Sequence, residues 1–314
     1  MSYLSGRCHD GRRVVGEVVA DLFGVPVSLG TVSAREAEMS GALAGAYAQA
    51  GRSVRSSANR NVDETGWRQA GRRRWLWVAA ARAAAVFAVH ARRGWDGLRS
   101  VLGPDPRAAA AGVVTSDRFP TYDGLDPARR QVCWSHLARD FRKWSEPGGP
   151  GPLARAMGRD GRAVARRVLA SWRDFRRGRV GRGRVGRGTL QEALARLRKR
   201  LGRVLRAGAR LAGAADAKAA TFCRKLIALG PALWTFAERD GVEPTNNHAE
   251  RCLRPAVLWR KNSFGAHSDR GCRFVERMLT VVTTLRLRHK GVLDYLCRAL
   301  AAHRLGLPAP SLLG

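Results

Sequence analysis

Three acidic residues stand in separate local contexts of this chain: Asp63 in NVDETGW, Asp117 in GVVTSDRFPTY and Glu250 in TNNHAERCLRP. Carboxylate oxygens are the ligands that hard divalent cations prefer, and two such cations can flank a phosphodiester during in-line displacement. The set therefore points to metal-dependent nucleotidyl transfer. Each residue also has a structural interpretation, because Asp63 could cap a turn, Asp117 could begin a loop and Glu250 could pair with Arg254.

The balance of charge favours a nucleic acid as the partner. The 314 residues include 57 Lys and Arg against 25 Asp and Glu, so the formal net charge is +32 and the isoelectric point is near 11.6. A surface this cationic attracts a phosphate backbone, although the abundance of Arg, Ala and Gly also allows that some arginines are merely solvated. The hydrophobic content of 45% supplies the core of a globular protein.

Two other classes of protein are disfavoured. The six cysteines are dispersed without a CxxC pair, which argues against a disulfide framework and against a zinc ribbon. No apolar stretch reaches the ~18 residues of a membrane-spanning helix, and the opening MSYLSGRCHDGRR lacks the apolar region of a signal peptide. We therefore expect a cytoplasmic, nucleoid-associated protein with no membrane partner.

The N-terminal part of the chain predicts helices. Residues 11–51 indicate a first helix, a turn near residues 24–28 and a second helix. This spacing resembles a helix-turn-helix. The alternative is two packed helices without a DNA role, whose core would include Val18, Leu22 and Val25.

The hydrophobic period then changes to that of strands. Residues 61–93 predict three short strands, and a helix is expected at 94–103. A buried apolar strand ending on Asp117 and a further strand within residues 129–136 follow. This order predicts a mixed α/β sheet in which Asp63 and Asp117 could meet, because functional groups of such sheets collect at strand ends.

A helical insertion is predicted next. Apolar residues recur at 4,3,4,3 spacing from Leu190 to Val204, and a second run from Phe222 to Phe236 repeats the pattern. Between the helices of the insertion, the Gly/Arg tract at 176–189 predicts a mobile cationic loop that touches DNA phosphate or is simply solvated. We expect a helical N-terminal segment at 1–55, a core at 56–145, the insertion at 146–240, and a second part of the core with C-terminal helices at 241–314.

The third acid is expected near the start of a helix. Thr245 or Asn246 can cap this helix, which places Glu250 about one turn in. Pro255 should limit or kink the helix, because proline lacks the backbone N–H of the helical ladder. Two further helices are predicted within residues 275–303.

Three multi-residue motifs, one around each of the three acids, occur in a fixed order along the chain. They are DETGWR followed by WLWV, then SDRFPTY followed by CWSHLARDF, and finally NNHAERCLRPAVLWRKNSFG. With these motifs the chain, over roughly residues 16–296, resembles the transposases of the bacterial insertion sequence 66 family. The resemblance implies an RNase H-like core interrupted by a helical insertion before the final acid, with Asp63, Asp117 and Glu250 as the DDE triad. The 133 positions from Asp117 to Glu250 (250 minus 117) agree with the insertion that the periodicity predicts.

The resemblance also implies cofactors and partners. Asp63 would bind both of two Mg²⁺ (or Mn²⁺) ions, and Asp117 and Glu250 would each complete the coordination of one. The expected reaction is DNA strand cleavage followed by strand transfer. Expected partners are double-stranded DNA at transposon ends and targets, further copies of the chain on that DNA, and small accessory proteins of the element. The residues expected to contact DNA are Asn247, Arg251, Arg254, Arg260, Lys261 and His136.

Two histidines and a cysteine have less certain roles. Cys133 and His136 match a C-x-x-H element of related transposases, and a structural role is favoured over a zinc site because two ligands are not four. His248 could contact the substrate or merely occupy the first turn of its helix.

The N-terminus and the alternative functions complete the expectations. Family members usually carry a metal-binding and DNA-binding segment ahead of the shared core, and Met1 of this chain falls close to the start of that core. A truncated chain of this kind should bind a terminal repeat about as tightly as a scrambled sequence. The competing functions are a catalytically inactive DNA-binding relic and an RNase H-like nuclease that acts on hybrids or junctions.

Overall fold

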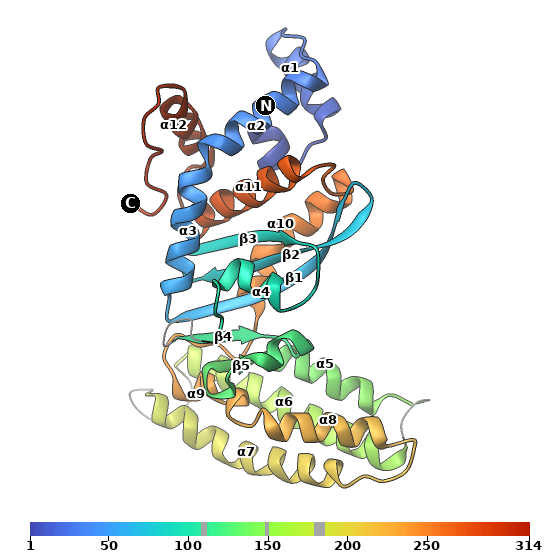
Figure 1. Cartoon of the computed structure of the whole chain (residues 1–314). Coiled ribbons are helices and arrows are strands. Elements are labelled where there is room, and N and C mark those ends of the chain that lie inside the picture. Colours follow the sequence, from blue (N-terminus) through green and yellow to red (C-terminus); the bar gives the residue numbers. More distant parts are fainter. Residues whose placement is uncertain (108–111, 148–150, 179–185) are drawn as a thin grey trace. The chain divides into compact units, whose positions relative to one another are not determined.

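The computed structural model describes residues 1–107, 112–147, 151–178 and 186–314. The chain divides into two compact units: unit 1 comprises residues 1–112 and 247–314, and unit 2 comprises residues 113–246. Each unit contains both strands and helices, so the predicted mixed α/β class is confirmed (Figure 1). The segment boundaries expected from the sequence stay predictions.

Unit 1 surrounds three antiparallel strands with helices. The strands lie in the order β3-β2-β1 and are β1 (Asn59–Gln69), β2 (Arg72–Ala81) and β3 (Ala84–His90). The helices are η1 (a π-helical turn, Leu4–Cys8), α1 (Arg12–Phe23), α2 (Leu29–Ala42), α3 (Ala44–Ser56), α4 (Trp95–Leu102), α10 (Asn247–Ser263), α11 (Asp269–Leu287) and α12 (Val292–Arg304). The three strands and the following helix predicted between residues 61 and 103 are confirmed.

The predicted helix pair at the N-terminus is also present, but its core differs from the expected one. Ser28 caps α2 by accepting a hydrogen bond from the Thr31 N–H at 3.1 Å. Val15, Val19 and Val32 form the buried cluster of this pair. The expectation for Leu22 and Val25 is wrong, since they are 71% and 51% exposed, and Val18 is only half-buried. The chain reverses at Gly24, and no third described element covers the tip of a two-helix hairpin.

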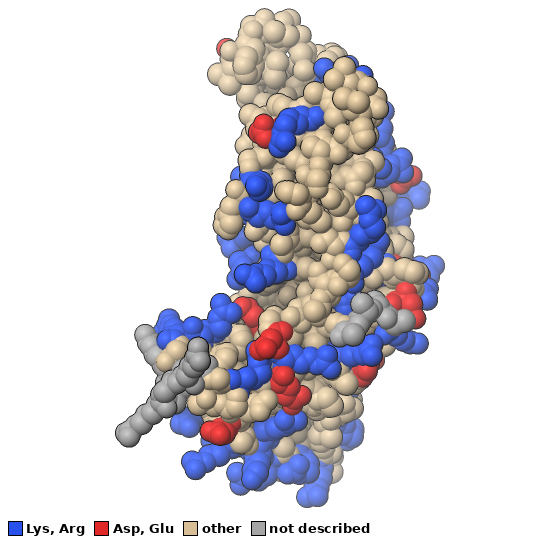
Figure 2. Space-filling model, turned by 90° about the vertical axis from the view of Figure 1, so that its left-hand side faces the viewer, with Lys and Arg blue, Asp and Glu red and all other residues tan. Residues whose placement is uncertain are grey.

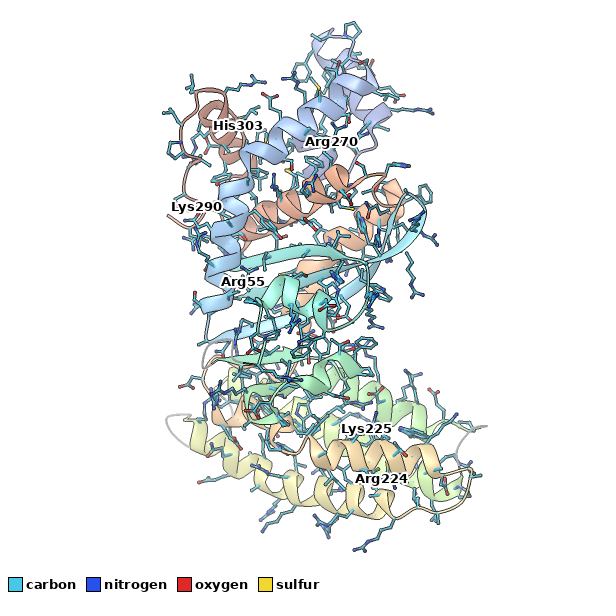
Figure 3. The ribbon with its side chains drawn as sticks, in the orientation of Figure 1. Arg55, Arg224, Lys225, Arg270, Lys290 and His303 are labelled. Atoms are coloured by element: carbon cyan, nitrogen blue, oxygen red, sulfur yellow. The ribbon has the colours of Figure 1, made fainter. Side chains whose placement is uncertain are left out.

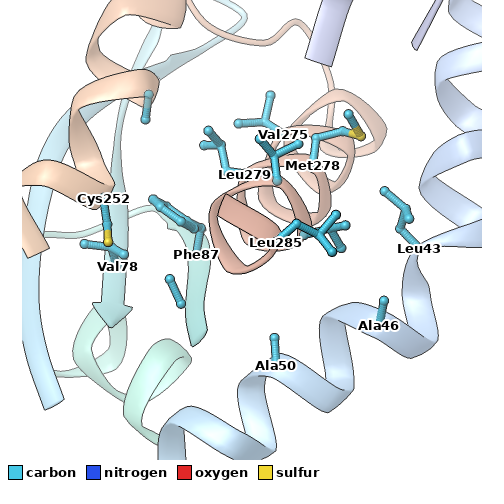
Figure 4. Close-up of a cluster of buried hydrophobic side chains, with 14 of the residues drawn as sticks. Leu43, Ala46, Ala50, Val78, Phe87, Cys252, Val275, Met278, Leu279 and Leu285 are labelled. Atoms are coloured by element: carbon cyan, nitrogen blue, oxygen red, sulfur yellow. The ribbon is translucent and has the colours of Figure 1, made fainter. Parts of the chain in front are cut away.

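The two faces of the strands in unit 1 pack against different helices. Leu76, Val78 and Phe87 belong to the main core with residues of α3, α10 and α11, part of which Figure 4 shows. Trp77 points to the opposite face, as the period of two along a strand requires. There it contacts Gly97 of α4, where a Cβ atom would overlap the indole. The absence of a side chain at Gly97 therefore lets α4 lie directly on Trp77.

Side chains of α11 hydrogen-bond the outer edge of β3. The N–H groups of Val89, Phe87 and Ala85 donate to Glu276, Thr280 and Thr284 at 2.6, 3.0 and 3.1 Å. The acceptors recur every four residues of α11, a rise of ~6 Å, and the donors recur every two residues of β3, a rise of ~6.8 Å. The spacing of the acceptors therefore matches that of the donors. The edge strand is thereby closed to pairing with another chain.

Glu276 makes the stability of unit 1 depend on pH. Burial raises the pKa of its carboxyl to about 7, although the Val89 N–H, Arg277 and Arg273 lower it. The folded state therefore resists ionisation that the unfolded chain undergoes from about pH 4.5. The neutral Glu276 carboxyl therefore contributes its full stabilisation below about pH 4.5. This contribution to the free energy of unfolding, on the order of 3 kcal/mol, is lost as the pH rises from about 4.5 to about 7.

We expect Glu276→Gln to remove this dependence, because the amide still accepts from Val89 and does not ionise. The variant should match the wild type near pH 5 and resist urea better near pH 8. Urea denaturation at both pH values measures this difference. Equal midpoints of the two proteins near pH 8 would mean that Glu276 ionises in the folded chain without cost.

Unit 2 combines two parallel strands with a helical bundle. The strands are β4 (Val113–Ser116) and β5 (Arg130–Val132), and Ser116 pairs with Val132. The α-helices are α5 (Trp134–Ser145), α6 (Pro152–Arg176), α7 (Arg187–Ala209), α8 (Ala217–Ala228) and α9 (Thr235–Glu238), and short 3₁₀ turns are η2 (Pro120–Gly124), η3 (Pro127–Arg129) and η4 (Pro231–Leu233). Both strands predicted around Asp117 and residues 129–136 are confirmed.

The helices predicted for the insertion are present in unit 2, with two differences from the expectation. The first apolar run is one helix, α7, which buries Leu190 and Leu201. The second run is not, because α8 ends at Ala228 and the Gly-Pro step at residues 230–231 starts a 3₁₀ turn. The tract at 176–189 is not a loop throughout, since α6 extends to its first residue and α7 begins at Arg187, while residues 179–185 lie outside the described part.

Candidate functional site

Asp63 lies in the middle of β1, on the face that packs against α10. It pairs across the hairpin with Val78, and Thr65 and Trp67 follow it on the same side of the strand. Trp67 is buried with residues of α10 and α11. One oxygen of the half-buried Asp63 carboxylate accepts a hydrogen bond from the Glu64 N–H at 2.9 Å. The strand thus fixes the direction of this carboxylate.

Two contacts fix how α10 lies along the strands. His248 donates from Nε2 to the carbonyl of Ala81, the last residue of β2, at 2.8 Å. Near the other end of the helix, Arg260 donates to Thr65 Oγ1 at 3.2 Å and to the Gly66 carbonyl. The helix therefore runs in the same direction as β1, with its N-terminus near the start of that strand.

Glu250 lies near the level of Asn61, two residues before Asp63 on the same side of β1. It lies in the first turn of α10, as predicted, ten residues before Arg260. Ten residues of helix rise ~15 Å, which corresponds to about four strand residues back from Thr65. Unit 1 therefore packs α10, with Glu250 in its first turn, on the face of the sheet that carries Asp63, although the two acids are 187 positions apart in sequence (250 minus 63).

Pro255 does not end α10, and the alternative ion pair between Glu250 and Arg254 is absent from the described residues, while a kink at Pro255 stays a prediction. The helix continues through Pro255 to Ser263, so proline does not limit it. Proline removes only one rung of the backbone ladder, and the buried residues Cys252, Ala256 and Trp259 hold the helix on both sides of that rung. Arg254 has no carboxylate within ion-pair distance in the described part of the chain, so the alternative pairing with Glu250 is absent.

Asp117 directly follows β4 in unit 2. Its Oδ1 accepts from the Phe119 N–H at 2.9 Å, which folds the next residues into a turn. The fully buried Arg130 secures this turn from β5, donating to the Asp117 carbonyl at 2.8 Å and to the Tyr122 carbonyl at 2.8 Å. Burial lowers the pKa of Arg130, and Asp123 opposes that shift. Sequence reasoning missed Arg130, the first residue of β5, which is fully buried.

Cys133 and His136 lie at the same strand ends of unit 2 as Asp117. Because Ser116 pairs with Val132, Cys133 follows β5 at the position where Asp117 follows β4. The buried Cys133 donates its N–H to the Ser116 carbonyl at 2.9 Å, and its sulfur accepts the Asn246 N–H at 3.2 Å. His136 Nε2 accepts from Arg139 at 2.9 Å. These contacts support a structural role for Cys133, and the DNA contact of His136 stays a prediction.

The predicted DNA contacts on α10 differ in how accessible they are. Asn247, Arg251, Arg254 and Lys261 are exposed, as a phosphate contact requires. Arg260 is half-buried, and its Nη1 donates hydrogen bonds to residues of β1. It therefore positions the helix, and only its other nitrogens could contact DNA.

A row of cations on α7 is a feature that sequence reasoning missed. Its members occur at steps of 3, 4, 3 and 4 residues, all are exposed, and none has a carboxylate within ion-pair distance in the described residues: Arg196, Lys199, Arg203, Arg206 and Arg210. This spacing places them on one stripe of the helix, opposite the buried leucines. Arg198 and Arg200, outside the stripe, pair with Glu238 and Asp160, each at 3.1 Å.

Basic residues are also exposed outside α7 and α10. Arg224 and Lys225 on α8 are exposed and are labelled in Figure 3. Figure 2 shows Lys and Arg spread over the face in view, with few Asp or Glu between them. The excess of basic residues in the composition therefore reaches the surface. None of the helices in the described residues is long and apolar enough to cross a membrane.

Comparisons with known proteins identify similar sequences. A profile described as "Transposase IS66 family" matches residues 13–274. The chain is also 25% identical over 218 residues to the uncharacterized protein y4qI of Sinorhizobium fredii (strain NBRC 101917 / NGR234). That match covers 64% of this chain and 38% of y4qI, so the chain spans well under half the length of that relative. No solved structure matches the chain.

Proposed function

Because the chain belongs to the IS66 family of transposases, we propose that it catalyses metal-dependent DNA strand cleavage and strand transfer for an insertion sequence. We further propose that its strands form an RNase H-like core, which helices of unit 2 interrupt before the third acid. The observation that supports the proposal is that α10, with Glu250 in its first turn, packs on the face of the unit 1 sheet that carries Asp63.

The donor set fits divalent cations. Asp63, Asp117 and Glu250 offer carboxylate oxygens, the ligands that Mg²⁺ and Mn²⁺ prefer. A carboxylate has about four lone-pair sites, so the hydrogen bond from Phe119 leaves Asp117 able to bind an ion. When bound, two such ions would supply charge stabilisation at the attacking and leaving oxygens of an in-line displacement.

The remaining residues of α10 would hold the DNA. Arg251 and Arg254 follow Glu250 on the exposed side of the helix and would neutralise phosphates next to the scissile bond. His248 and Arg260 act through the helix, since their hydrogen bonds to Ala81 and Thr65 set its position against β1. A shift of ~1 Å in Glu250 would be enough to impair an aligned displacement.

Nicking of supercoiled DNA tests the proposal. The purified chain should convert supercoiled plasmid to open circles with Mg²⁺ or Mn²⁺ and not with EDTA. A chain that binds the plasmid but never nicks it with either ion is the inactive relic. Cleavage of the RNA strand of a hybrid, with the plasmid untouched, would identify the nuclease alternative.

A further inference from the structure

Unit 1 contains a cavity of about 610 Å³ between η1, α10 and α11. Its floor is apolar and buried, with Cys252, Leu279 and Val282, and Pro255 and the half-exposed Leu258 form one wall. Gly6 allows η1 to approach α11 this closely, because a Cβ atom there would overlap Met278. The volume lies within the range of small-molecule sites, roughly 300–1,000 Å³.

The charge at this cavity has one sign. Four arginines, Arg7, Arg251, Arg254 and Arg286, line it, and no carboxylate does. None of the four has a carboxylate within ion-pair distance among the residues that the structure describes. The pKa of His9 in the same lining falls to about 4 through burial, then through the charges of Arg7 and Arg286. His9 is therefore neutral, and the positive potential comes from the guanidinium groups.

An apolar floor below a ring of cations selects a particular kind of ligand. The ligand must carry a negative group for the guanidinium groups, which bind phosphate in a fork-like geometry. It must also bring an apolar, flat body to exclude water from Leu279 and Val282. A nucleotide has both parts, and base contacts with apolar or aromatic walls are typical of proteins that take a base out of its stack.

We propose that this cavity receives a single unstacked nucleotide, with its phosphate on Arg251, Arg254 and Arg286 and its base against Leu258 and Val282. The nucleotide would belong to a DNA strand, because Arg251 lines the cavity and directly follows Glu250 on α10, so that a strand bound at the proposed acid would pass the cavity. The inference rests on the proposed function for its source of DNA. It adds a site that holds a base, which phosphate contacts alone do not provide.

The test compares two probes under conditions where no cleavage occurs. One is a short single-stranded oligonucleotide, and the other is the same backbone with every base replaced by an abasic spacer, both titrated in EDTA. The wild type should bind the base-bearing strand roughly tenfold more tightly, the effect of one base contact. Equal affinity for the two probes would overturn the proposal.

Variants locate the preference. Leu258→Ala removes a base contact, and the pair Arg254→Ala with Arg286→Ala releases the phosphate that seats the base in the cavity, so both changes should abolish most of the tenfold preference. The controls are Leu293→Ala, at a leucine exposed on α12, and the pair Arg13→Ala with Arg273→Ala, at exposed arginines outside the cavity. The controls should keep the preference. Cavity variants that fold and retain it would place the base elsewhere and contradict the assignment.

A competition experiment with free nucleotide shows whether the cavity binds a nucleotide within a DNA strand or a free nucleotide. Deoxyadenosine monophosphate should compete only weakly, because it lacks the neighbouring phosphates of a strand. Competition as strong as that of the oligonucleotide would make the cavity a site for free nucleotide and overturn its role with DNA. Binding in EDTA does not require catalysis, so a chain that fails to nick plasmid can still pass this test.

Discussion

Replacing any one of the three acids by its amide is expected to reduce metal-dependent nicking by roughly a thousandfold, since a lost metal ligand removes several kcal/mol of transition-state stabilisation. The variants are Asp63→Asn, Asp117→Asn and Glu250→Gln, which keep the size of the side chain and remove its charge. The initial rate of conversion of supercoiled plasmid to open circles measures the effect.

Two matched variants separate loss of a ligand from loss of charge. Asp96→Asn on α4 and Glu192→Gln on α7 change exposed acids that lie outside the proposed site, and both should nick at the wild-type rate. All five variants should bind DNA in EDTA at least as well as the wild type, because each removes a negative charge. A triad variant that nicks like Asp96→Asn would remove that residue from the catalytic set.

Neutralising the cation stripe of α7 is expected to give the second large effect. The variant replaces Arg196, Lys199, Arg203, Arg206 and Arg210 with glutamine. Each lost phosphate contact lowers the slope of log K against log salt by about 0.9, so five contacts lower it by about 4.5 and weaken binding at least about a hundredfold at low salt. Titration of a duplex at about 50 and 200 mM salt measures both quantities.

A second variant with the same change in net charge is the control. It replaces five exposed cations scattered over unit 1: Arg13, Arg52, Arg92, Arg273 and Lys290. If the stripe is a local surface that binds DNA phosphates, the control variant should lose far less affinity for the duplex and keep most of the salt slope. Equal losses would show that only the total charge matters and that the stripe is a solvated helix face.

The sequence by itself determined the local elements and the candidate chemistry. The three strands of unit 1, the helix around Glu250 and helix α7 follow from periods of two and of 3.6 residues, which reflect contacts between near neighbours. The motifs around Asp63, Asp117 and Glu250 also lie within short segments. The family was therefore visible before any coordinate, and the profile match confirms it.

The sequence predicted less well where the outcome depended on what covers a residue. Leu22 and Val25 have the pattern of core residues, yet they lie at a hairpin tip and are exposed. Pro255 normally ends a helix, yet packing on both sides carries α10 past it. A local pattern describes which residues can be buried, and the neighbouring elements determine which of them are.

Only the tertiary structure decided how distant residues meet. The hydrogen bonds of His248 with Ala81 and of Arg260 with Thr65 span 167 and 195 positions, and they set α10, with Glu250 in its first turn, along the face of the sheet that carries Asp63. The ladder from α11 to β3 and the arginine-lined cavity likewise join segments remote in sequence. Such contacts leave no local periodicity, because they depend on the packing of whole elements rather than on the spacing of neighbours.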